Sequence, residues 1–345
     1  LYDNLSTEII RQQVSRMGDS LVLSQVGQLV RVHLHTNDPT GLVELLAACG
    51  TLMETKADDM RTQQRLASRH EGRTALVVDS IADVPTDKLG PHAYVLPMNL
   101  IADGVSYQRT ISVRMVAALS GRLSSSQLNP EEVRQFLDPI LHSYDHVLIL
   151  SVSARMSGLY DRYQSYLHGV APGRARLVDT RLNSAAEGLL ALYAAERLRE
   201  GIDMDAVADE VVARRGRTRI LVSLPNLDAM VASGRLNRRV GRMLRAIGYL
   251  PLVTINAKGE GAVTGFSFSR GHSNRLLMNR VVAARPEQWA LVYFGNPAQA
   301  HAIADDMTQR LGSAPAYVSN ISAVVANFSG EGAWAIAYVE PEVGA

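Results

Sequence analysis

The chain has 345 residues, of which 47% are apolar and 20% charged, and its formal net charge is +1. This length exceeds one ordinary core, so we expect two or three domains in the composition range of soluble globular proteins. The near-zero charge gives no electrostatic support for a nucleic-acid partner, and no run of about 18 apolar residues is present to span a membrane. The single cysteine, Cys49, excludes an internal disulfide and favours a reducing compartment, which we expect to be cytoplasmic. Because the chain begins at Leu1 without a charged and apolar leader, we expect it to be a fragment of a longer product.

Residues 1–66 are predicted to form a small α+β unit. Its expected elements, in chain order, are a helix at 7–17, strands at 20–24 and 29–35, a helix at 40–49 and a strand near 51–53. Gly27 marks the turn between the first two strands, and Gly50 ends the second helix as its C-terminal cap. The polar stretch 60–73 is expected to be a helix end followed by a linker.

A second unit begins at Thr74, and its first lobe is predicted to span about 74–184. Three short apolar runs that end in polar residues indicate buried parallel strands, at 75–78, 146–152 and 175–179. Asn129 and Glu132, with a proline between them, form a strong helix start, because Asn can cap and Glu can complete a capping box. Strands that alternate with helices predict a parallel sheet whose ligand loops lie at the carboxyl ends of the strands.

A second lobe with a mixed sheet is predicted from about 185 to 340. Two helices, at 185–200 and 204–215, precede strands at 219–222, 250–255, 265–268, 289–293, 316–318 and 334–338. Gly259-Glu260-Gly261 is typical of a hairpin turn and lacks the glycine pattern of a phosphate-binding loop. The sequence contains no P-loop, dinucleotide-binding fingerprint or Gly-x-Ser-x-Gly elbow, so we predict no catalytic residue and no cofactor.

Ser157 and Gly158 stand between the predicted strand 146–152 and a predicted helix at 159–167. A helix N-terminus offers free N–H groups and a favourable dipole, so Ser157 is a candidate ligand for an anion. The alternative is that Ser157 only caps the helix, which is the commoner task of a serine in this position.

Ser125 and Ser126 are predicted to lie in a loop just before the cap at Asn129, where the alternative is a polar loop without a ligand. Arg235, between a glycine and a leucine, is a candidate for pointing inward, whereas the arginines after it are spaced like a solvated helix face. An anion that leaves water needs charge-assisted or dense hydrogen bonds. Hydroxyls, N–H groups and one guanidinium could together hold a single carboxylate at the mouth of an apolar pocket.

Five motifs, in this order and spacing, carry a family resemblance: Asp79-Ser80-Ile81-Ala82-Asp83-Val84-Pro85, Ser124-Ser125-Ser126-Gln127, Met156-Ser157-Gly158-Leu159, Asp179-Thr180 and Ser233-Gly234-Arg235-Leu236. Through them, residues 74–340 resemble the DegV family of bacterial fatty-acid-binding proteins. The resemblance implies an α/β fold of two lobes that buries one long-chain fatty acid between them. It further implies that a partner kinase phosphorylates the fatty acid carboxylate to an acyl phosphate. The residues implicated by position are Ser125, Ser126, Ser157, Gly158 and Arg235 at the head group, with Asp79, Ser80 and Phe328 as supporting residues.

Phe328 departs from the family pattern, because it stands where the family carries a histidine that assists at the head group. Phe294 likewise replaces the histidine of a frequent family His-Gly-Asn run. A phenyl ring can neither donate a proton nor bind an anion. We therefore expect fatty acid binding to persist and phosphorylation of the bound head group to be impaired.

Residues 1–66 resemble the middle domain of the fatty acid kinase catalytic subunit, of the DAK2/DhaL type. The match rests on Gly18-Asp19-Ser20-Leu21-Val22, on Val32-His33-Leu34-His35-Thr36-Asn37-Asp38-Pro39 and on Asp59-Met60-Arg61-Thr62-Gln63. In that family two histidines and a cysteine form a metal site, and His33 and His35 on one side of a strand fit two of the ligands. Ser6 stands in place of the thiolate, so we predict no metal and regard the two histidines as weak candidates.

The leading hypothesis is a carrier that binds a fatty acid and presents it to a fatty acid kinase subunit. One alternative is a phosphotransfer component of a fatty acid or dihydroxyacetone-type kinase whose nucleotide-binding domain lies outside this chain. The other is a degenerate regulatory module that senses lipid, for which Phe328 and Phe294 are the best support.

Overall fold

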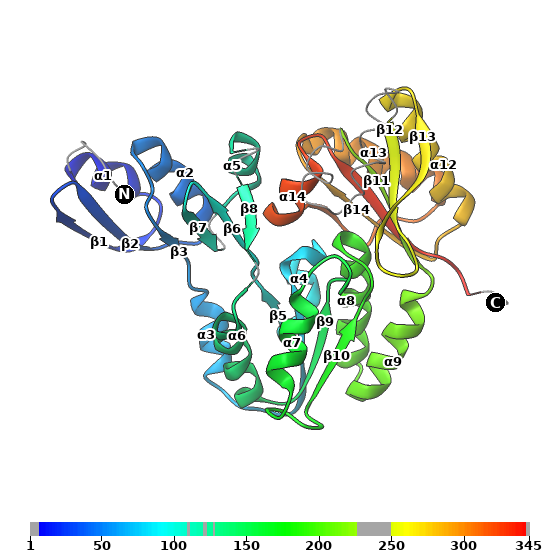
Figure 1. Cartoon of the computed structure of the whole chain (residues 1–345), viewed down its shortest axis with the longest axis horizontal. Coiled ribbons are helices and arrows are strands. Elements are labelled where there is room, and N and C mark those ends of the chain that lie inside the picture. The colour runs from blue at the N-terminus through cyan, green and yellow to red at the C-terminus, as the bar shows by residue number, and fades with distance from the viewer. Residues whose placement is uncertain (1–6, 109–110, 120–122, 127, 226–249, 343–345) are drawn as a thin grey trace.

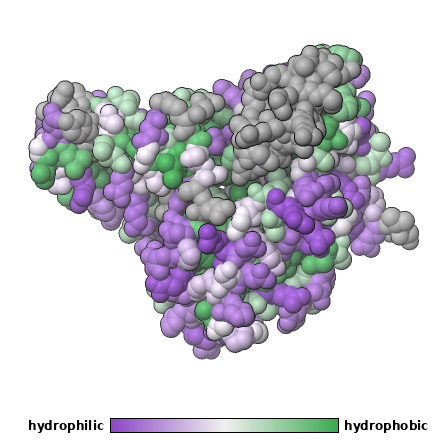
Figure 2. Space-filling view, in the orientation of Figure 1, coloured by the Kyte–Doolittle hydropathy of each residue, from purple (hydrophilic) through white to green (hydrophobic). Residues whose placement is uncertain are grey.

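The structure is a computed structural model that describes residues 7–108, 111–119, 123–126, 128–225 and 250–342. Figure 1 shows a small N-terminal unit at one end, a sheet flanked by helices in the middle and a second, larger sheet at the other end. This arrangement confirms the predicted class, an α/β protein with a parallel-sheet lobe, a mixed-sheet lobe and a small α+β unit. In the view of Figure 2, hydrophilic residues predominate on the lower part of the molecule, where Figure 1 shows the parallel sheet and its helices.

The N-terminal unit consists of α1 (Thr7–Val14), β1 (Asp19–Val26), β2 (Leu29–His35) and α2 (Pro39–Cys49). As predicted, β1 and β2 pair as an antiparallel hairpin, and α2 ends at Gly50. Ile10 and Val14 on one face of α1 are completely buried, and α1 contacts both α2 and β1. These buried residues belong to the same hydrophobic cluster as the core of the parallel sheet.

The predicted strand near 51–53 is wrong. The strand that follows α2 is β3 (Thr55–Lys56), and it extends a different sheet from the β1–β2 hairpin. It pairs in parallel with β7 (Val105–Gln108), and the Thr55 hydroxyl donates a hydrogen bond to the Ser106 carbonyl over 3.0 Å. The position of β3 is decided by its partner β7, about 50 residues later in the chain, and the propensities of the residues of β3 cannot predict such a distant partner.

A bridging sheet with the strand order β3-β7-β6-β8 joins the N-terminal unit to the rest of the chain. Its remaining strands are β6 (Asn99–Ala102) and β8 (Leu123–Ser126). A second contact reinforces the junction, because the Ser112 hydroxyl, which caps α5 (Val113–Ala118), also donates to the Glu44 carboxylate on α2. The loop predicted for Ser125 and Ser126 is wrong, because both residues belong to β8, which forms an edge of this sheet.

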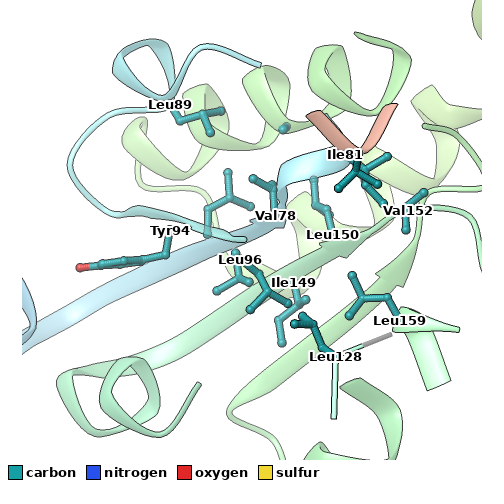
Figure 3. Close-up of a cluster of buried hydrophobic side chains, with 14 of the residues drawn as sticks. Val78, Ile81, Leu89, Tyr94, Leu96, Leu128, Ile149, Leu150, Val152 and Leu159 are labelled. Carbon is teal, nitrogen blue, oxygen red and sulfur yellow. The ribbon is translucent and has the colours of Figure 1, made fainter. Parts of the chain in front are cut away.

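The parallel sheet has the strand order β10-β9-β4-β5. Its strands are β4 (His70–Asp79), β5 (Ala93–Leu96), β9 (Tyr144–Ser151) and β10 (Ala175–Asp179). Val78 and Leu150 are register partners in the middle of this sheet and are completely buried (Figure 3). The predicted strands β4, β9 and β10 are confirmed. Parallel strands that are covered on both faces contain continuous apolar runs, which made β4 and β9 predictable.

Helices cover the parallel sheet. They are α3 (Met60–Leu66), α4 (Thr86–Leu89), α6 (Pro130–Ser143), α7 (Leu159–Leu167), α8 (Ser184–Arg199) and α9 (Met204–Arg215), with a 3-10 turn, η1 (Ser80–Ala82), directly after β4. We predicted α8 and α9 to open the second lobe. The structure places α9 against β9 and β10 of the first sheet, whereas α8 contacts both β4 and three strands of the mixed sheet. Gly188 permits the close approach of α8 to η1, because a Cβ atom there would lie 2.6 Å from the Ala82 carbonyl oxygen.

The mixed sheet has the strand order β13-β12-β11-β16-β14-β15. Its strands are β11 (Thr218–Ser223), β12 (Leu250–Ile255), β13 (Gly261–Ser267), β14 (Gln288–Tyr293), β15 (Val318–Asn320) and β16 (Trp334–Val339). The helices α12 (Arg270–Ala284) and α13 (Pro297–Leu311) pack on this sheet. A further helix, α14 (Ala323–Ser329), follows β15 and contacts α5, η1, β6 and β8. All six strands overlap the predicted ranges, and β14 with β15 is the one parallel pair among them. The predicted hairpin turn between β12 and β13 is also confirmed, with Gly259 at φ +83°.

The helix start predicted at Asn129 is a complete capping box. The Asn129 side chain accepts from the Glu132 N–H group over 2.9 Å, and the Glu132 carboxylate accepts from the Asn129 N–H group over 2.7 Å. The same Glu132 carboxylate accepts from the Asn99 side chain on β6, so this cap also ties α6 to the bridging sheet.

Replacing Asn129 with Ala should lower the free energy of unfolding by about 1 kcal/mol, because the start of α6 loses its side-chain acceptor. Urea unfolding followed by circular dichroism measures the change. Asn129→Asp is the matched control, since a carboxylate keeps the acceptor and should cost much less. Equal stability of the Ala variant and the wild-type protein would show that the cap contributes nothing.

Candidate functional site

A cavity of about 380 Å³ lies between the carboxyl ends of the parallel strands and the mixed sheet. Aliphatic side chains from the segments that follow β4 and β9, from the mixed sheet and from α14 make up most of its wall, among them Ile81, Val152, Ile220, Val253, Val292 and Val324. Figure 3 shows Ile81 and Val152 close together beyond the ends of β4 and β9. The wall is thus built from segments that are distant in sequence and meet only in the fold.

Four of the residues singled out from the sequence line this one cavity: Ser125, Ser157, Gly158 and Phe328. Ser125 reaches it from β8, where its backbone pairs with Leu100, and Phe328 reaches it from α14. Both side chains are half-buried. Of Ser126 the structure describes only the backbone pairing with Asn99, and Arg235 lies outside the described residues, so their predicted roles stay predictions.

Ser157 is not the N-cap of α7, because that position belongs to Gly158. The Ser157 hydroxyl oxygen accepts from the Leu159 N–H group over 3.3 Å, and its own N–H group donates to the Ser153 carbonyl over 3.1 Å. A hydroxyl that accepts one hydrogen bond keeps its hydrogen for donation. The Ser157 hydroxyl can therefore accept from the first N–H group of α7 and still donate to an anion in the cavity, so its role as a ligand stays a prediction.

Asp79 and Ser80 stand behind the wall of the cavity. The two oxygens of the fully buried Asp79 carboxyl accept from the N–H groups of Ile81, over 3.0 Å, and Val152, over 2.9 Å. The Ser80 hydroxyl accepts from the Met98 N–H group over 3.0 Å. Ile81, Val152 and Met98 all line the cavity, so both supporting residues fix the backbone of its wall.

Asp83 connects three elements around the cavity, a role that was not predicted from the sequence. Its carboxyl accepts from the Ser322 N–H group at the start of α14, over 2.6 Å, and from the Ser184 hydroxyl at the start of α8, over 2.5 Å. Asp83 itself has φ +50°, in the left-handed region that costs energy for a residue with a Cβ atom. The only available signal was its place in the Asp79-to-Pro85 motif.

Burial changes the acidity of this group of carboxyls. Loss of water raises the pKa of Asp79 from 3.8 to about 6, against the opposing hydrogen bonds from Val152 and Ile81. The same loss raises the pKa of Asp83 from 3.8 to about 7, with a further increase from the charge of Asp79. Burial and the neighbouring Asp79 and Asp83 raise the pKa of Glu187 on α8 well above its usual range. Tyr317, whose pKa burial also raises, lies close to Asp83 and Glu187.

The metal candidates of the N-terminal unit lie side by side, with the His33 and His35 ring centroids 5.3 Å apart. His35 Nδ1 lies 3.6 Å from an Asp19 carboxylate oxygen. Within the described ranges no group of three His, Cys, Asp or Glu side chains is arranged to hold a metal, and Ser6 lies outside those ranges. The absence of a metal at these histidines therefore remains a prediction.

No helix in the described parts of the chain has the length and apolar character needed to cross a membrane.

Asp83→Asn should make the protein more stable above about pH 7 and flatten its pH dependence. A carboxyl whose pKa is raised by folding binds protons in the folded state between about pH 4 and pH 7, so the free energy of unfolding falls as the pH rises through that window. The slope is at most about 1.4 kcal/mol per pH unit for each carboxyl. Asn keeps an acceptor for the Ser322 N–H group but carries no charge to desolvate.

Urea unfolding from about pH 5 to about pH 8 measures this effect. Asp87→Asn, at an exposed position on α4, is the control and should leave the profile unchanged. Asp79 and Glu187 retain their own pH dependence in every variant. If Asp83→Asn keeps the wild-type slope, Asp83 does not titrate in this window.

Two family profiles match the chain. Residues 73–341 match the profile of the uncharacterised protein family DegV, and residues 2–67 match the profile of the middle domain of FakA-like fatty acid kinase proteins. A DegV domain-containing protein of Streptomyces coelicolor is 27% identical over 278 residues, which cover 77% of this chain and 96% of that protein. One from Caldanaerobacter subterraneus is 25% identical over 194 residues, 54% of this chain and 69% of that protein.

Solved structures share the fold. A DegV family protein from Thermus thermophilus, described as fatty acid binding, superposes with a TM-score of 0.68 at 24% identity, over 77% of this chain and 99% of that one. The fatty acid kinase (Fak) B3 protein of Streptococcus pneumoniae, loaded with linoleic acid, superposes with a TM-score of 0.68 at 14% identity, over 78% of this chain and 100% of that one. The predicted resemblance is confirmed in both parts of the chain, and since the DegV profile covers well over half of it, the chain belongs to the DegV family.

Proposed function

We propose that this chain binds one long-chain fatty acid in the cavity between its two lobes. The observation that carries the proposal is an aliphatic cavity into which Ser125 and Ser157 bring hydroxyl groups. Its volume of about 380 Å³ is in the range of small-molecule sites, about 300–1,000 Å³. Each methylene group buried in such a wall contributes about 0.8 kcal/mol, so an acyl chain supplies most of the binding free energy.

We propose that the carboxylate of the fatty acid lies near Ser125 and Ser157. A carboxylate is an acceptor of hydrogen bonds only, so hydroxyl and N–H donors are the groups that it requires. The half-buried positions of both serines leave this end of the cavity partly accessible to water, where a charged head group costs less to place. The aliphatic side chains of the mixed sheet and α14 then surround the chain of the fatty acid.

The family comparisons support a role in a fatty acid kinase system. The Thermus thermophilus relative is described as fatty acid binding, and the Streptococcus pneumoniae relative is a fatty acid kinase (Fak) B3 protein loaded with linoleic acid. We infer that this chain is a carrier that presents its fatty acid to a kinase subunit. We also propose 1–66 and 74–340 as its two domains, in line with the two matched profiles.

The match of residues 2–67 to the middle domain of FakA-like fatty acid kinase proteins favours a second candidate. In that case the protein to which this chain belongs performs phosphotransfer itself, with a nucleotide-binding domain outside this chain. Incubation of the full-length protein with fatty acid and ATP distinguishes the two candidates, since acyl phosphate forms without an added kinase only in the second.

Protein purified under native conditions should carry a fatty acid at close to one per chain, measured by native mass spectrometry and by extraction. After removal of the lipid, Ser157→Ala should bind added fatty acid about 10- to 100-fold more weakly, because it loses one charge-assisted hydrogen bond worth roughly 1.5–3 kcal/mol. Ser165→Ala, at an exposed position on the same helix, is the control. A chain that neither carries nor takes up fatty acid would refute the function, whereas unchanged affinity in Ser157→Ala would remove only this residue from the site.

Phe328→His should increase the phosphorylation of the bound fatty acid by a cognate kinase, by roughly 10- to 100-fold. The phenyl ring that lines the cavity cannot stabilise charge on the carboxylate during phosphoryl transfer, whereas an imidazole can. The rates are compared at equal ligand occupancy, with Phe328→Leu as the control for a change in ring packing. If the wild-type protein reacts as fast as Phe328→His, Phe328 does not limit the reaction.

A further inference from the structure

One charged side chain lines the cavity, and none of the roles described above involves it. Among the described residues that form the wall, Arg155 alone carries a charge; the others are aliphatic, aromatic or uncharged polar residues. We propose that Arg155 is the cation that pairs with the bound carboxylate and makes the cavity select ionised fatty acids over neutral lipids. This inference rests on the proposed function and adds the source of its specificity.

The position of Arg155 places its charge beside the candidate head-group ligands. It lies two residues before Ser157, in the turn between β9 and α7 that also contributes Ala154 and Met156 to the cavity wall. The residue is exposed, so this turn forms the solvent side of the cavity. A guanidinium here can meet a carboxylate at the cavity mouth without being buried itself, which avoids the cost of desolvating a cation.

The backbone that carries Arg155 is held in place. Its N–H group donates to the Ser153 hydroxyl oxygen over 3.2 Å, and that hydroxyl donates to the Gly259 carbonyl in the β12–β13 turn over 2.7 Å. The N–H groups of Met156 and Ser157 donate to the Ser153 carbonyl over 2.9 and 3.1 Å. The completely buried Ser153 thus fixes the turn against the second lobe and limits the positions that the Arg155 side chain can reach.

The guanidinium of Arg155 has no ion-pair partner in the described parts of the chain. Other arginines of the chain are neutralised, as Arg197 is by Glu210 and Arg214 is by Glu287, with N–O separations of 2.8 and 2.7 Å. An arginine stays protonated at all physiological pH values and can donate two parallel hydrogen bonds to one carboxylate. Arg155 is therefore available for an anion that the protein itself does not supply.

The identity of residue 328 increases the need for such a cation. Phe328 brings no charge to the cavity, and the hydroxyls of Ser125 and Ser157 are neutral donors. Hydrogen bonds to charged groups are roughly twice as strong as those between neutral groups. The serine hydroxyls already donate more strongly to a carboxylate than to an ester, and a cation adds an attraction that an ester or alcohol of the same chain length does not have.

The test compares the affinities of the delipidated protein for palmitate and for methyl palmitate. We expect Arg155→Gln to bind palmitate about 2- to 5-fold more weakly and methyl palmitate with unchanged affinity, so that the preference for the acid falls by the same factor. Arg155→Lys should keep most of the preference, because it keeps the charge. Arg162→Gln, on α7 and outside the cavity wall, should behave as the wild type does. Circular dichroism confirms that each variant is folded.

Three outcomes would overturn the inference. If Arg155→Gln keeps the wild-type ratio of acid to ester affinity, Arg155 is not the partner of the carboxylate. The proposed binding of fatty acid is not affected by that result. Loss of the preference in Arg235→Gln but not in Arg155→Gln assigns the pairing to Arg235 instead. A wild-type protein that binds neither ligand refutes the proposed function and the inference with it.

Discussion

Asp83 accepts one hydrogen bond from the Ser322 N–H group and another from the Ser184 hydroxyl, and so joins η1 to the starts of α14 and α8. The two ends of the first bond are 239 residues apart in the chain. Asp79, four residues earlier, fixes the N–H groups of Ile81 and Val152. A buried carboxyl is costly unless its hydrogen bonds are satisfied, so this pair tolerates little displacement of the elements it connects. The shape of the cavity depends on these two carboxyls, although neither of them lines it.

The parts of the fold that the sequence could predict are those with strong local patterns. β4 and β9 could be predicted from their apolar runs, because both faces of these strands are covered. The start of α6 could be predicted from Asn129, because the hydrogen bonds of its cap are local. The short strands β6 and β8 have four residues each, too few to show periodicity, and they were missed. Their existence is decided by pairing with each other and not by their own residues.

The candidate site likewise contains residues that the sequence could identify and residues that it could not. Ser157 could be found because a strand followed directly by a helix start is visible in sequence, and Ser125 because a family motif carries it. Asp83 and Arg155 could not be given their roles, since an acid or an arginine in a turn has the same local appearance whether it faces a cavity, a distant helix or solvent. Burial and long-range contacts decide between these environments, and only the folded chain contains them.

The bridging sheet has a consequence for how this protein can be divided. Its β3 strand belongs to the N-terminal unit, whereas β8 at the opposite edge carries Ser125. A shortened chain that begins at residue 74 would lack β3 and would leave β7 as a new open edge of the bridging sheet. Exposed edges recruit strands from other molecules, so such a chain would tend to self-associate. The proposed boundary between 1–66 and 74–340 therefore cuts the bridging sheet of this chain, and the smallest unit that keeps this sheet whole extends across it.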